Sequence, residues 1–365
     1  MKALAFYLPQ YHEIPENNRF WGKGFTEWTN VKTAQPLFWG HNQPRVPLGH
    51  HYYNLLEQGV MSAQMKLAKA YGIYGFCIYH YWFCGKKLLE KPVENILNLP
   101  DKNFHYCFSW ANGSWSKKWL GDQEGKTIIM RQNYGGEDDW RAHFEYLLPY
   151  FRDPRYIKKD GKPLFLIYRS MDIPRCAAMM EFMNGQARQN GLKGIFFIDT
   201  RHYVGQRDIM GFDASFEFEP FYSMDCYHDR YPVTAGEIIK SWRHAPLCCR
   251  LPIYDYRRFY RNMTERTKHY AAADKPRYLG AFVDWDNTAR RKKDPTLVFA
   301  GASPKGFGAY FERQVKNSRK LGNEFIFINA WNEWGEGTYL EPDEKNGYGY
   351  LKAVKKAIGE ETGTC

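Results

Sequence analysis

The most informative segment of the chain covers residues 324–342 and reads Glu-Phe-Ile-Phe-Ile-Asn-Ala-Trp-Asn-Glu-Trp-Gly-Glu-Gly-Thr-Tyr-Leu-Glu-Pro. It begins with a short apolar run, Phe325 to Ile328, which is typical of a strand buried on both faces. Two acids three residues apart follow, Glu333 and Glu336, among glycines and tryptophans. Crowding or burying two carboxylates raises the pKa of at least one, because like charges oppose joint ionisation. The segment therefore predicts a general acid beside a base or nucleophile, with a solvated loop as the alternative.

Seven further apolar runs of strand length precede this segment, and helix-length amphipathic segments alternate with them. The eight runs cover residues 3–8, 75–79, 105–109, 163–168, 195–199, 213–219, 278–283 and 324–329. Eight buried strands that alternate with helices are most simply a (β/α)8 barrel, the α/β fold known as the TIM barrel. A doubly wound open sheet is the alternative, but it favours a glycine-rich turn after an early strand, and here Pro9-Gln10 follows the first strand.

One domain accounts for the whole pattern. No low-complexity linker or internal repeat interrupts the sequence, so we expect a single catalytic domain over residues 1–365. Long βα loops should form a cleft at the C-terminal face of the barrel. A long polar loop rich in glycine and proline follows the first strand, and a segment of poor periodicity at residues 221–252 predicts an excursion over the barrel mouth.

The composition is that of a globular protein that needs no disulfide or metal to build a core. A chain of 365 residues can bury about three quarters of its unfolded surface. None of the eight cysteines forms a Cys-x-x-Cys pair, so we expect reduced thiols and neither a metal nor a cofactor. The sequence from Met1 leaves no room for a signal peptide, and no run approaches about 20 apolar residues. We therefore expect a cytoplasmic protein without a transmembrane segment.

The chain is basic, with 51 Lys+Arg against 40 Asp+Glu and a net charge of +11. Such a balance can attract nucleic acid, acidic glycans or anionic lipid. The basic residues are dispersed, however, and no nucleic-acid-binding motif accompanies them, so we expect no nucleic-acid partner. The densest cluster, Arg-Arg-Lys-Lys at residues 290–293, favours a phosphate or a weak association with an anionic membrane surface.

Polar and aromatic side chains gather where the expected strands end. Aromatic residues make up 18% of the chain, and flat aromatic faces beside amides and acids suit sugar rings. Catalytic residues of a (β/α)8 barrel lie at these C-terminal strand ends. Besides the two acids, the candidate substrate-binding residues there are Tyr11, His12, His80, Tyr81, Trp82, Trp110, Asn112, Glu217, Glu219, Asp284, Trp285, Asp286 and Asn332. For any one of them, such as His12, a structural hydrogen bond is an equally good interpretation.

These residues allow a narrow range of chemistry. No Gly-x-Ser-x-Gly segment indicates acyl transfer, and no His-x-x-x-His segment indicates a metal. Carboxylates with aromatic side chains remain, and glycosidic-bond chemistry uses that combination. Carboxyl groups about 5 Å apart would support retention of configuration and about 6.5–9.5 Å inversion, which the sequence leaves open.

Four motifs carry a resemblance to a known family. They are Tyr-Leu-Pro-Gln-Tyr-His at 7–12, Gly-Lys-Gly-Phe-Thr-Glu-Trp-Thr-Asn-Val at 22–31, Trp-Asp-Asn-Thr at 285–288 and Trp-Asn-Glu-Trp-Gly-Glu-Gly-Thr-Tyr-Leu-Glu-Pro at 331–342. Over nearly its whole length the chain resembles the WbsX-type proteins, which are related to glycoside hydrolase family 99 and often occur in bacterial surface-polysaccharide gene clusters. The motifs add Glu27, Trp28, Trp331 and Trp334 to the candidate substrate-binding residues.

The resemblance implies a (β/α)8 fold and a metal-independent, retaining action on α-linked sugars. In family 99 the two acids of a Glu-x-x-Glu motif act on a mannoside, and they match Glu333 and Glu336 here. In that family the first acid takes a proton from the sugar's own 2-hydroxyl, which gives a 1,2-anhydro intermediate. The second protonates the leaving oxygen and later activates water.

Three functions follow as hypotheses, each with an oligo- or polysaccharide as the expected partner. A retaining glycoside hydrolase or transglycosylase acting on a bacterial surface polysaccharide fits the paired acids on an aromatic rim. A glycosyltransferase of O-antigen or capsular polysaccharide biosynthesis, the label commonly given to WbsX-type proteins, fits the basic surface. Its Asp-x-Asp metal-diphosphate motif is missing, since we interpret the matching spacing of Asp284 and Asp286 as accidental. A non-catalytic glycan-binding barrel is the more distant alternative.

Overall fold

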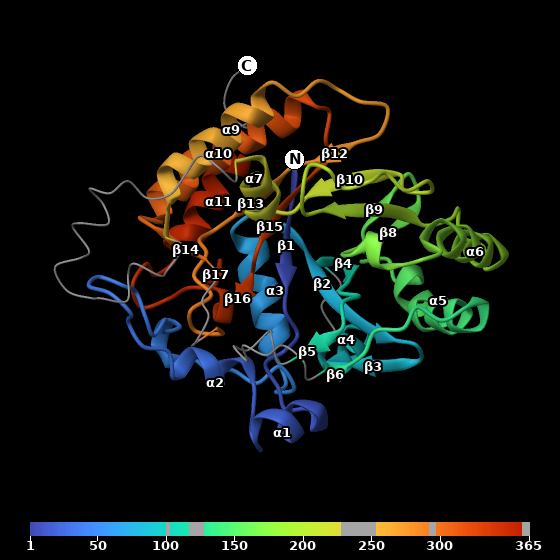
Figure 1. Cartoon of the computed structure of the whole chain (residues 1–365), viewed down its shortest axis with the longest axis horizontal. Helices are drawn as coiled ribbons and strands as arrows, with labels where there is room; N and C mark the ends of the chain where they lie inside the picture. Colours follow the sequence, from blue (N-terminus) through green and yellow to red (C-terminus); the bar gives the residue numbers. More distant parts are fainter. Residues whose placement is uncertain (100–102, 117–127, 228–252, 292–296, 360–365) are drawn as a thin grey trace.

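The computed structural model describes residues 1–99, 103–116, 128–227, 253–291 and 297–359. Its centre is a parallel sheet that curves into a nearly closed barrel, in the order β12-β10-β9-β8-β4-β2-β1-β15-β13 (Figure 1). These strands are β1 (Lys2–Tyr7), β2 (Ile73–Phe83), β4 (His105–Trp110), β8 (Lys162–Ile167), β9 (Phe196–Arg201), β10 (Ala214–Glu217), β12 (Arg277–Tyr278), β13 (Gly280–Phe282) and β15 (Phe325–Asn329). The predicted barrel is confirmed, and each strand overlaps one of the eight predicted runs.

The barrel closes through the segment that holds β12 and β13. Only Leu279 separates these two strands, yet β12 pairs with β10 and β13 pairs with β15. Leu279 O also accepts a hydrogen bond from Phe327 N of β15 at 3.2 Å. At Gly280 this segment approaches β10 closely: a Cβ here would lie 2.1 Å from Glu217 O. The seam of the barrel therefore requires glycine at position 280.

We expect Gly280→Ala to lower the free energy of unfolding by about 2–3 kcal/mol, because the added methyl group forces β10 away from the seam. Urea unfolding measures the change. Gly185→Ala is the matched control, since Gly185 lies inside α6 (Cys176–Gln189) and nothing lies within 4 Å of a Cβ there. Alanine favours a helix, so the control should be neutral or slightly stabilising. Equal stabilities for the two variants would contradict this account of the seam.

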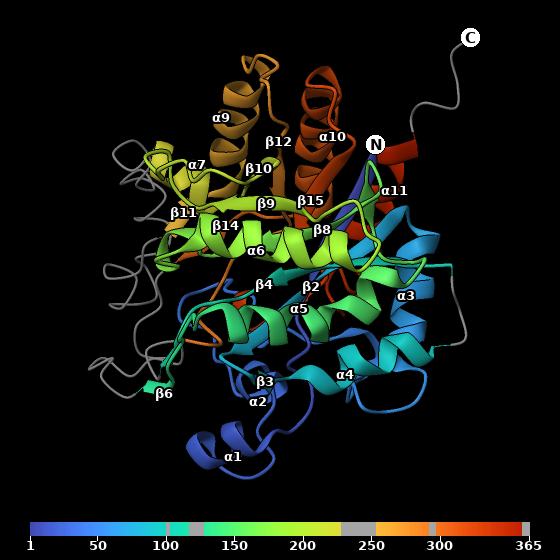
Figure 2. The same cartoon turned by 90° about the vertical axis from the view of Figure 1, so that its right-hand side faces the viewer.

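Helices surround the barrel (Figures 1 and 2). α5 packs against α6, and α10 packs against both α9 and α11. The helices are α1 (Pro15–Trp21), α2 (Glu27–Lys32), α3 (Val60–Ala70), α4 (Glu90–Asn95), α5 (Glu137–Arg152), α6 (Cys176–Gln189), α7 (Phe221–Cys226), α9 (Tyr256–Lys268), α10 (Pro304–Lys320) and α11 (Gly349–Gly359). Among the residues that the structure describes, no helix has both the length and the apolar character that a membrane crossing needs.

Short elements complete the loops at the barrel ends. They are the strands β3 (Lys86–Leu88), β5 (Trp115–Ser116), β6 (Ile128–Met130), β7 (Lys158–Lys159), β11 (Ile253–Asp255), β14 (Val298–Ala300), β16 (Asn332–Glu333) and β17 (Thr338–Tyr339), and the 3-10 helix η6 (Trp334–Glu336). β16 pairs antiparallel with β17, and β11 runs parallel to β14 outside the barrel.

Aromatic side chains fill the interior of the barrel. Phe6 of β1, Phe216 of β10 and Phe327 of β15 contact one another, with ring centroids 4.6 to 6.0 Å apart. Because β1 and β10 are not neighbours in the sheet, this contact crosses the barrel. Alternate residues of each strand point inward, and the residues between them point toward the helices. This alternation decides which strand-end side chains can reach a cavity at the barrel mouth.

The segment after the first strand contains two helices where we predicted a polar loop. Pro15 begins α1, and Thr26 forms a capping box with Thr29 at the start of α2. Both are helix-start signals, which the high glycine and proline content of the segment obscured. The second helix matters for function because it begins with Glu27.

The predicted excursion at residues 221–252 is described only in part. Its first residues form α7, and residues 228–252 lie outside the described part of the chain.

Candidate active site

The two acids of the Glu-x-x-Glu segment lie on a tight hairpin just beyond β15. β16 and β17 form its two arms, and η6 connects them. Asn332 fastens the hairpin to the first strand: its Oδ1 accepts a hydrogen bond from Leu8 N at 2.7 Å, and its Nδ2 donates to Leu8 O at 3.0 Å. Glu333 and Glu336 are thereby held at the C-terminal end of the barrel, where catalytic residues of this fold lie.

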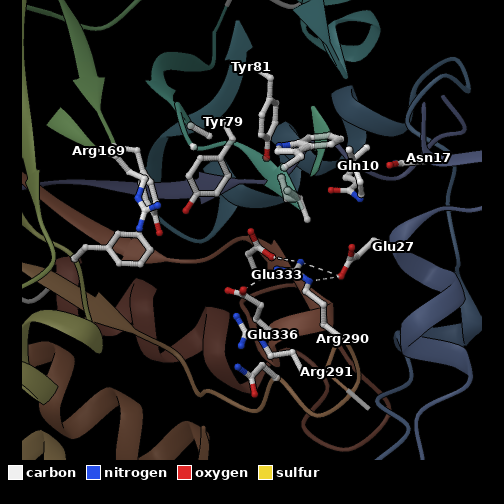
Figure 3. Close-up of a pocket in the computed structure, with 18 of the residues that line it drawn as sticks. Gln10, Asn17, Glu27, Tyr79, Tyr81, Arg169, Arg290, Arg291, Glu333 and Glu336 are labelled. Carbon is white, nitrogen blue, oxygen red and sulfur yellow. Dashed lines mark hydrogen bonds and ion pairs between the residues drawn. The ribbon is translucent and has the colours of Figure 1, made fainter. Parts of the chain in front are cut away.

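A buried arginine joins both acids to a third carboxylate. Arg290 donates from Nη2 to Glu333 Oε2 at 2.8 Å and from Nη1 to Glu336 Oε1 at 2.6 Å. Its Nε donates to Oε1 of Glu27 at 2.9 Å (Figure 3). Arg290 is 7% exposed and Glu27 is 1% exposed, so little water screens these ion pairs. The three carboxylates share one guanidinium, and the cluster is negative overall when all three are ionised.

The glycine between the two acids makes room for the third. A Cβ at Gly335 would lie 1.7 Å from Glu27 Oε1 and 3.2 Å from Arg290 Nε. Any side chain at this position would therefore displace Glu27 from Arg290. The sequence Glu-Trp-Gly-Glu places two carboxylates on one turn and leaves the space for the third to approach from α2.

Burial raises the pKa of both Glu333 and Glu336 above the usual carboxyl range. The positive charge of Arg290 opposes this rise, whereas the negative charge of Glu27 adds to it. The side chain of Glu336 is 16% exposed and that of Glu333 is 6% exposed, so Glu336 is the acid closer to solvent. The pair therefore retains a proton at a pH at which an exposed glutamate would have lost it.

The acids open into a cavity of about 430 Å³. This volume lies within the range of small-molecule sites, roughly 300–1,000 Å³. The wall is largely aromatic and includes Trp21, Tyr79, Tyr81, Trp115, Tyr168, Phe218, Phe221 and Trp285. Its polar lining is made by Gln10, Asn17, Glu27, Asn287, Arg169, Arg290, Arg291, Glu333 and Glu336. In Figure 3 the hydroxyl ends of Tyr79 and Tyr81 point toward the acids from the opposite wall.

Strand alternation separates the three candidate residues at the end of β2. Tyr81 lines the cavity, as does Tyr79, which the sequence analysis missed. His80 and Trp82 point the other way, toward α5: His80 Nε2 lies 2.8 Å from His143 Nε2, and Trp82 stacks on the His143 ring. Burial lowers the pKa of His80 to about 3, which keeps this imidazole neutral. His80 and Trp82 are therefore placed in the packing between strand and helix.

The same alternation applies at β10. Phe218 lines the cavity, whereas Glu217 and Glu219 point outward to Arg266 of α9. Glu219 Oε1 lies 3.0 Å from Arg266 Nη2 and accepts a hydrogen bond from Ser223 Oγ at 2.7 Å. Burial raises the pKa of Glu219 to about 7 in spite of these partners. Neither acid reaches the cavity.

Of the three candidates after β13, only Trp285 lines the cavity. Asp284 pairs with Arg45 at 2.9 Å. Asp286 Oδ2 accepts hydrogen bonds from Gln43 Nε2 at 2.7 Å and from His41 Nε2 at 2.8 Å. His41 Nε2 is the donor because Nδ1 of the same ring accepts a hydrogen bond from a backbone N–H. Burial alone would raise the pKa of Asp286, but the His41 hydrogen bond and the Arg45 charge lower it below the usual range. Both aspartates therefore fasten loops to the barrel.

The tryptophans of the last motif support the hairpin from behind. Trp331 Nε1 and Trp334 Nε1 donate to the buried Glu341 at 3.1 and 2.6 Å. Glu341 also accepts from Tyr53 and Gln64, at 2.9 and 2.8 Å. Trp331, Trp334 and Asn332 are thus buried around the acids and do not line the cavity.

The remaining candidates lie near the cavity without lining it. Tyr11 donates its hydroxyl to Asn332 O, and Trp28 Nε1 donates to a backbone carbonyl at 2.8 Å. Trp110 Nε1 donates to a backbone carbonyl at 3.2 Å, and Asn112 donates to another at 2.9 Å. His12 is 1% exposed, and burial lowers its pKa to about 4. The structure thus brings together Glu27, Tyr81, Trp285, Glu333 and Glu336 of the predicted set.

Arg290 corrects the interpretation of the basic cluster. We expected residues 290–293 to favour a phosphate or a membrane surface, but Arg290 is buried and its charge is used by three carboxylates. Arg291 lines the cavity, and residues 292 and 293 lie outside the described part of the chain. The sequence offers no signal for this role, because an arginine in a run of basic residues normally lies on the surface.

Two solved structures with a similar fold are glycoside hydrolases or resemble them by name. The GH99 endo-α-mannosidase from Bacteroides thetaiotaomicron aligns with a TM-score of 0.56 at 14% identity, over 98% of this chain and 96% of that chain. A glycoside hydrolase-like protein aligns with a TM-score of 0.60 at 13% identity, over 98% of this chain and 93% of that chain. At such low identities the likeness shows the shared barrel fold.

Sequence comparison identifies closer relatives. The uncharacterized protein WxcX of Xanthomonas campestris pv. campestris (strain B100) is 35% identical over 365 residues, which cover 97% of this chain and 49% of that protein. The chain therefore spans about half the length of the curated relatives it matches. The family model described as Glycosyltransferase WbsX matches residues 3–354. Because this match covers nearly the whole chain, the protein belongs to the WbsX family, as its motifs predicted.

Proposed function

We propose that the protein is a carbohydrate-active enzyme that acts on glycosidic bonds of a bacterial surface polysaccharide, with Glu333 and Glu336 as its catalytic acids. The observation that carries the proposal is the buried pair of carboxyl groups, bound to one arginine, at the wall of an aromatic cavity. Aromatic faces stack on sugar rings, and paired carboxyl groups are the machinery of glycosidic-bond chemistry. The name of the family and the glycoside hydrolase fold support the same class of substrate.

Each acid keeps one oxygen for the substrate. Arg290 binds Glu333 Oε2 and Glu336 Oε1. In the described part of the chain no group donates a hydrogen bond to Glu333 Oε1 or Glu336 Oε2. Because both residues line the cavity, these oxygens are available to a bound sugar. Arg290 fixes the rotamers of both side chains, which is the positioning that acid–base catalysis needs.

The match of the two acids to the Glu-x-x-Glu motif of family 99 is the basis for a division of roles. Glu333, the more buried acid, takes the proton of the sugar 2-hydroxyl, and the 2-oxygen forms a bond to C1. At the same time Glu336, the acid closer to solvent, gives its proton to the leaving oxygen as the C1–oxygen bond breaks. Glu336 then takes a proton from the incoming hydroxyl group, which opens the anhydro ring at C1, and Glu333 returns its proton to the 2-oxygen. Two displacements at C1 give retention of configuration.

The incoming hydroxyl group decides between hydrolysis and transfer. Water gives a glycoside hydrolase, and a sugar hydroxyl gives a transglycosylase. The name of the family favours a third candidate, a glycosyltransferase that takes its sugar from an activated donor. The acid pair serves all three, so the donor and the acceptor have to be tested.

A binding and turnover panel tests the proposal. We expect α-linked oligosaccharides and manno-configured iminosugars to raise the melting temperature, because a ligand at a hundredfold excess over Kd adds about 2.7 kcal/mol to the unfolding free energy. Nuclear magnetic resonance should show that the first product keeps the anomeric configuration of the substrate. Stabilisation by nucleotide sugars alone would favour the glycosyltransferase. If no glycan or nucleotide sugar binds or reacts, the proposed function is wrong.

A further inference from the structure

Two adjacent arginines of the cavity have different surroundings. Arg290 is buried and shared by three carboxylates, as described above. Arg291 is only partly buried, and its backbone N–H donates to Asn287 O at 2.9 Å. Its side chain lines the cavity and forms no hydrogen bond or ion pair with the residues that the structure describes. Within the described part of the chain, Arg291 therefore leaves the N–H groups of its guanidinium to whatever the cavity holds.

Arg291 lies on the Glu336 side of the acid pair. Figure 3 shows it beyond Glu336, on the opposite side of the pair from Tyr81. The two side chains are close enough for the charge of Arg291 to lower the pKa of Glu336, against the larger effect of burial. In the proposed mechanism Glu336 protonates the leaving oxygen, so Arg291 faces the leaving-group side of the scissile bond.

The pairing of the charged groups that line the cavity points in the same direction. Its lining contains three carboxyl groups, Glu27, Glu333 and Glu336, and three guanidinium groups, Arg169, Arg290 and Arg291. Arg169 pairs with Asp172 at 3.5 Å, and Arg290 is shared by the three carboxyl groups. Arg291 is therefore the guanidinium group of this lining that has no ion-pair partner among the described residues. An arginine in a partly desolvated wall binds a carboxylate or a phosphate more strongly than a neutral hydroxyl group, because the hydrogen bonds are charge-assisted.

We propose that the cavity takes a glycan with an anionic group, a carboxylate or a phosphate, on the sugar that leaves, and that Arg291 binds this group. The inference rests on the proposed function, because it places Glu336 at the leaving oxygen. It also names the class of polysaccharide that the enzyme would act on: one with acidic or phosphorylated units. The residue that meets the anion is Arg291, because Arg290 is already neutralised.

The test uses disaccharides that differ only at C6 of the leaving sugar, as a hydroxymethyl group, a carboxylate or a phosphate monoester. Calorimetry gives Kd, and product release gives kcat/KM, for the wild type and for Arg291→Gln. Arg188→Gln is the matched control, because Arg188 is an exposed arginine of α6 outside the cavity. We expect the wild type to prefer one of the anionic sugars by about tenfold, as for a single charge-assisted hydrogen-bonding group, and Arg291→Gln to lose that preference.

The outcomes separate the two proposals. Preference for the carboxylate identifies an acidic sugar, and preference for the phosphate identifies a phosphorylated one. In either case the preference should weaken with added salt and survive in Arg188→Gln. Equal use of neutral and anionic sugars by the wild type, or an unchanged preference in Arg291→Gln, overturns the inference and leaves the proposed function standing. If no disaccharide of any kind binds or reacts, both proposals fail.

Discussion

Replacing Glu336 with glutamine should lower kcat for an unactivated glycan by about a thousandfold, because glutamine cannot give a proton to the leaving oxygen. The same variant should keep most of its kcat/KM for a dinitrophenyl glycoside, whose leaving group needs no proton, because kcat/KM reports the steps up to the release of that group. Glu333→Gln should lose both activities, because the 2-hydroxyl proton has to be removed whatever the leaving group. Steady-state kinetics on the two substrates measures the difference.

This pair of variants tests the roles of the acids and not only their importance. Glu145→Gln is a suitable control, since Glu145 is exposed on α5 and lies outside the cavity. Circular dichroism and melting temperature establish that each variant is folded. If Glu336→Gln loses its activity on the dinitrophenyl glycoside as completely as Glu333→Gln does, the assignment of Glu336 as the acid is wrong. An unimpaired Glu336→Gln enzyme would exclude catalysis by this pair altogether.

The strands of the barrel could be predicted because a strand buried on both faces leaves a local signal. Residues 325–328 are apolar without interruption, and the structure shows them fully buried in β15. Helices α1 and α2 left a weaker signal, because a short helix is defined by its first turn. The only sequence signals for these helices are Pro15 at the start of α1 and the Thr26 capping box at the start of α2. The surrounding glycines and prolines make both signals hard to recognise.

The inward or outward direction of a strand-end side chain is harder to predict. The run from Tyr79 to Trp82 contains aromatic or imidazole groups at every position, so the sequence gives no alternation to follow. In the structure Tyr79 and Tyr81 reach the cavity and His80 and Trp82 face α5. A shift of one residue would exchange the two sets. The register of β2 against β1 and β4 fixes which of the two sets faces the cavity, and this register is a tertiary property.

The third carboxylate and the shared arginine also depend on tertiary structure. Glu27 and Arg290 are separated by 263 positions in the chain, and only the folded barrel brings them together. The motif that contains Glu27 suggested a substrate-binding role for it through family resemblance. The basic run around Arg290 suggested the surface. What unites them is Gly335, whose missing side chain leaves the space that both groups occupy.

Arg290→Met should lower the free energy of unfolding by about 3–5 kcal/mol at neutral pH, because it leaves three buried carboxylates without their cation. The variant should also lose activity. Arg155→Met is the matched control: Arg155 is 2% exposed and pairs with Asp153 at 2.6 Å, outside the cavity. Arg155→Met should lower the free energy of unfolding by a comparable amount, yet its remaining activity should keep the wild-type pH dependence.

The pH dependence of this loss of stability follows from the sign of the pKa changes. Arg290 lowers the pKa values of Glu333 and Glu336, so its removal raises them further above their values in the unfolded chain. A folded state with raised carboxyl pKa values holds more protons than the unfolded state, so its stability falls as pH rises. The loss in Arg290→Met should therefore be small near pH 4, where the carboxyls are protonated in both states, and should grow toward pH 8. Adding Glu27→Gln should recover part of it. A loss that is constant from pH 4 to pH 8 would mean that Arg290 only fills space and does not control the charge of the acid pair.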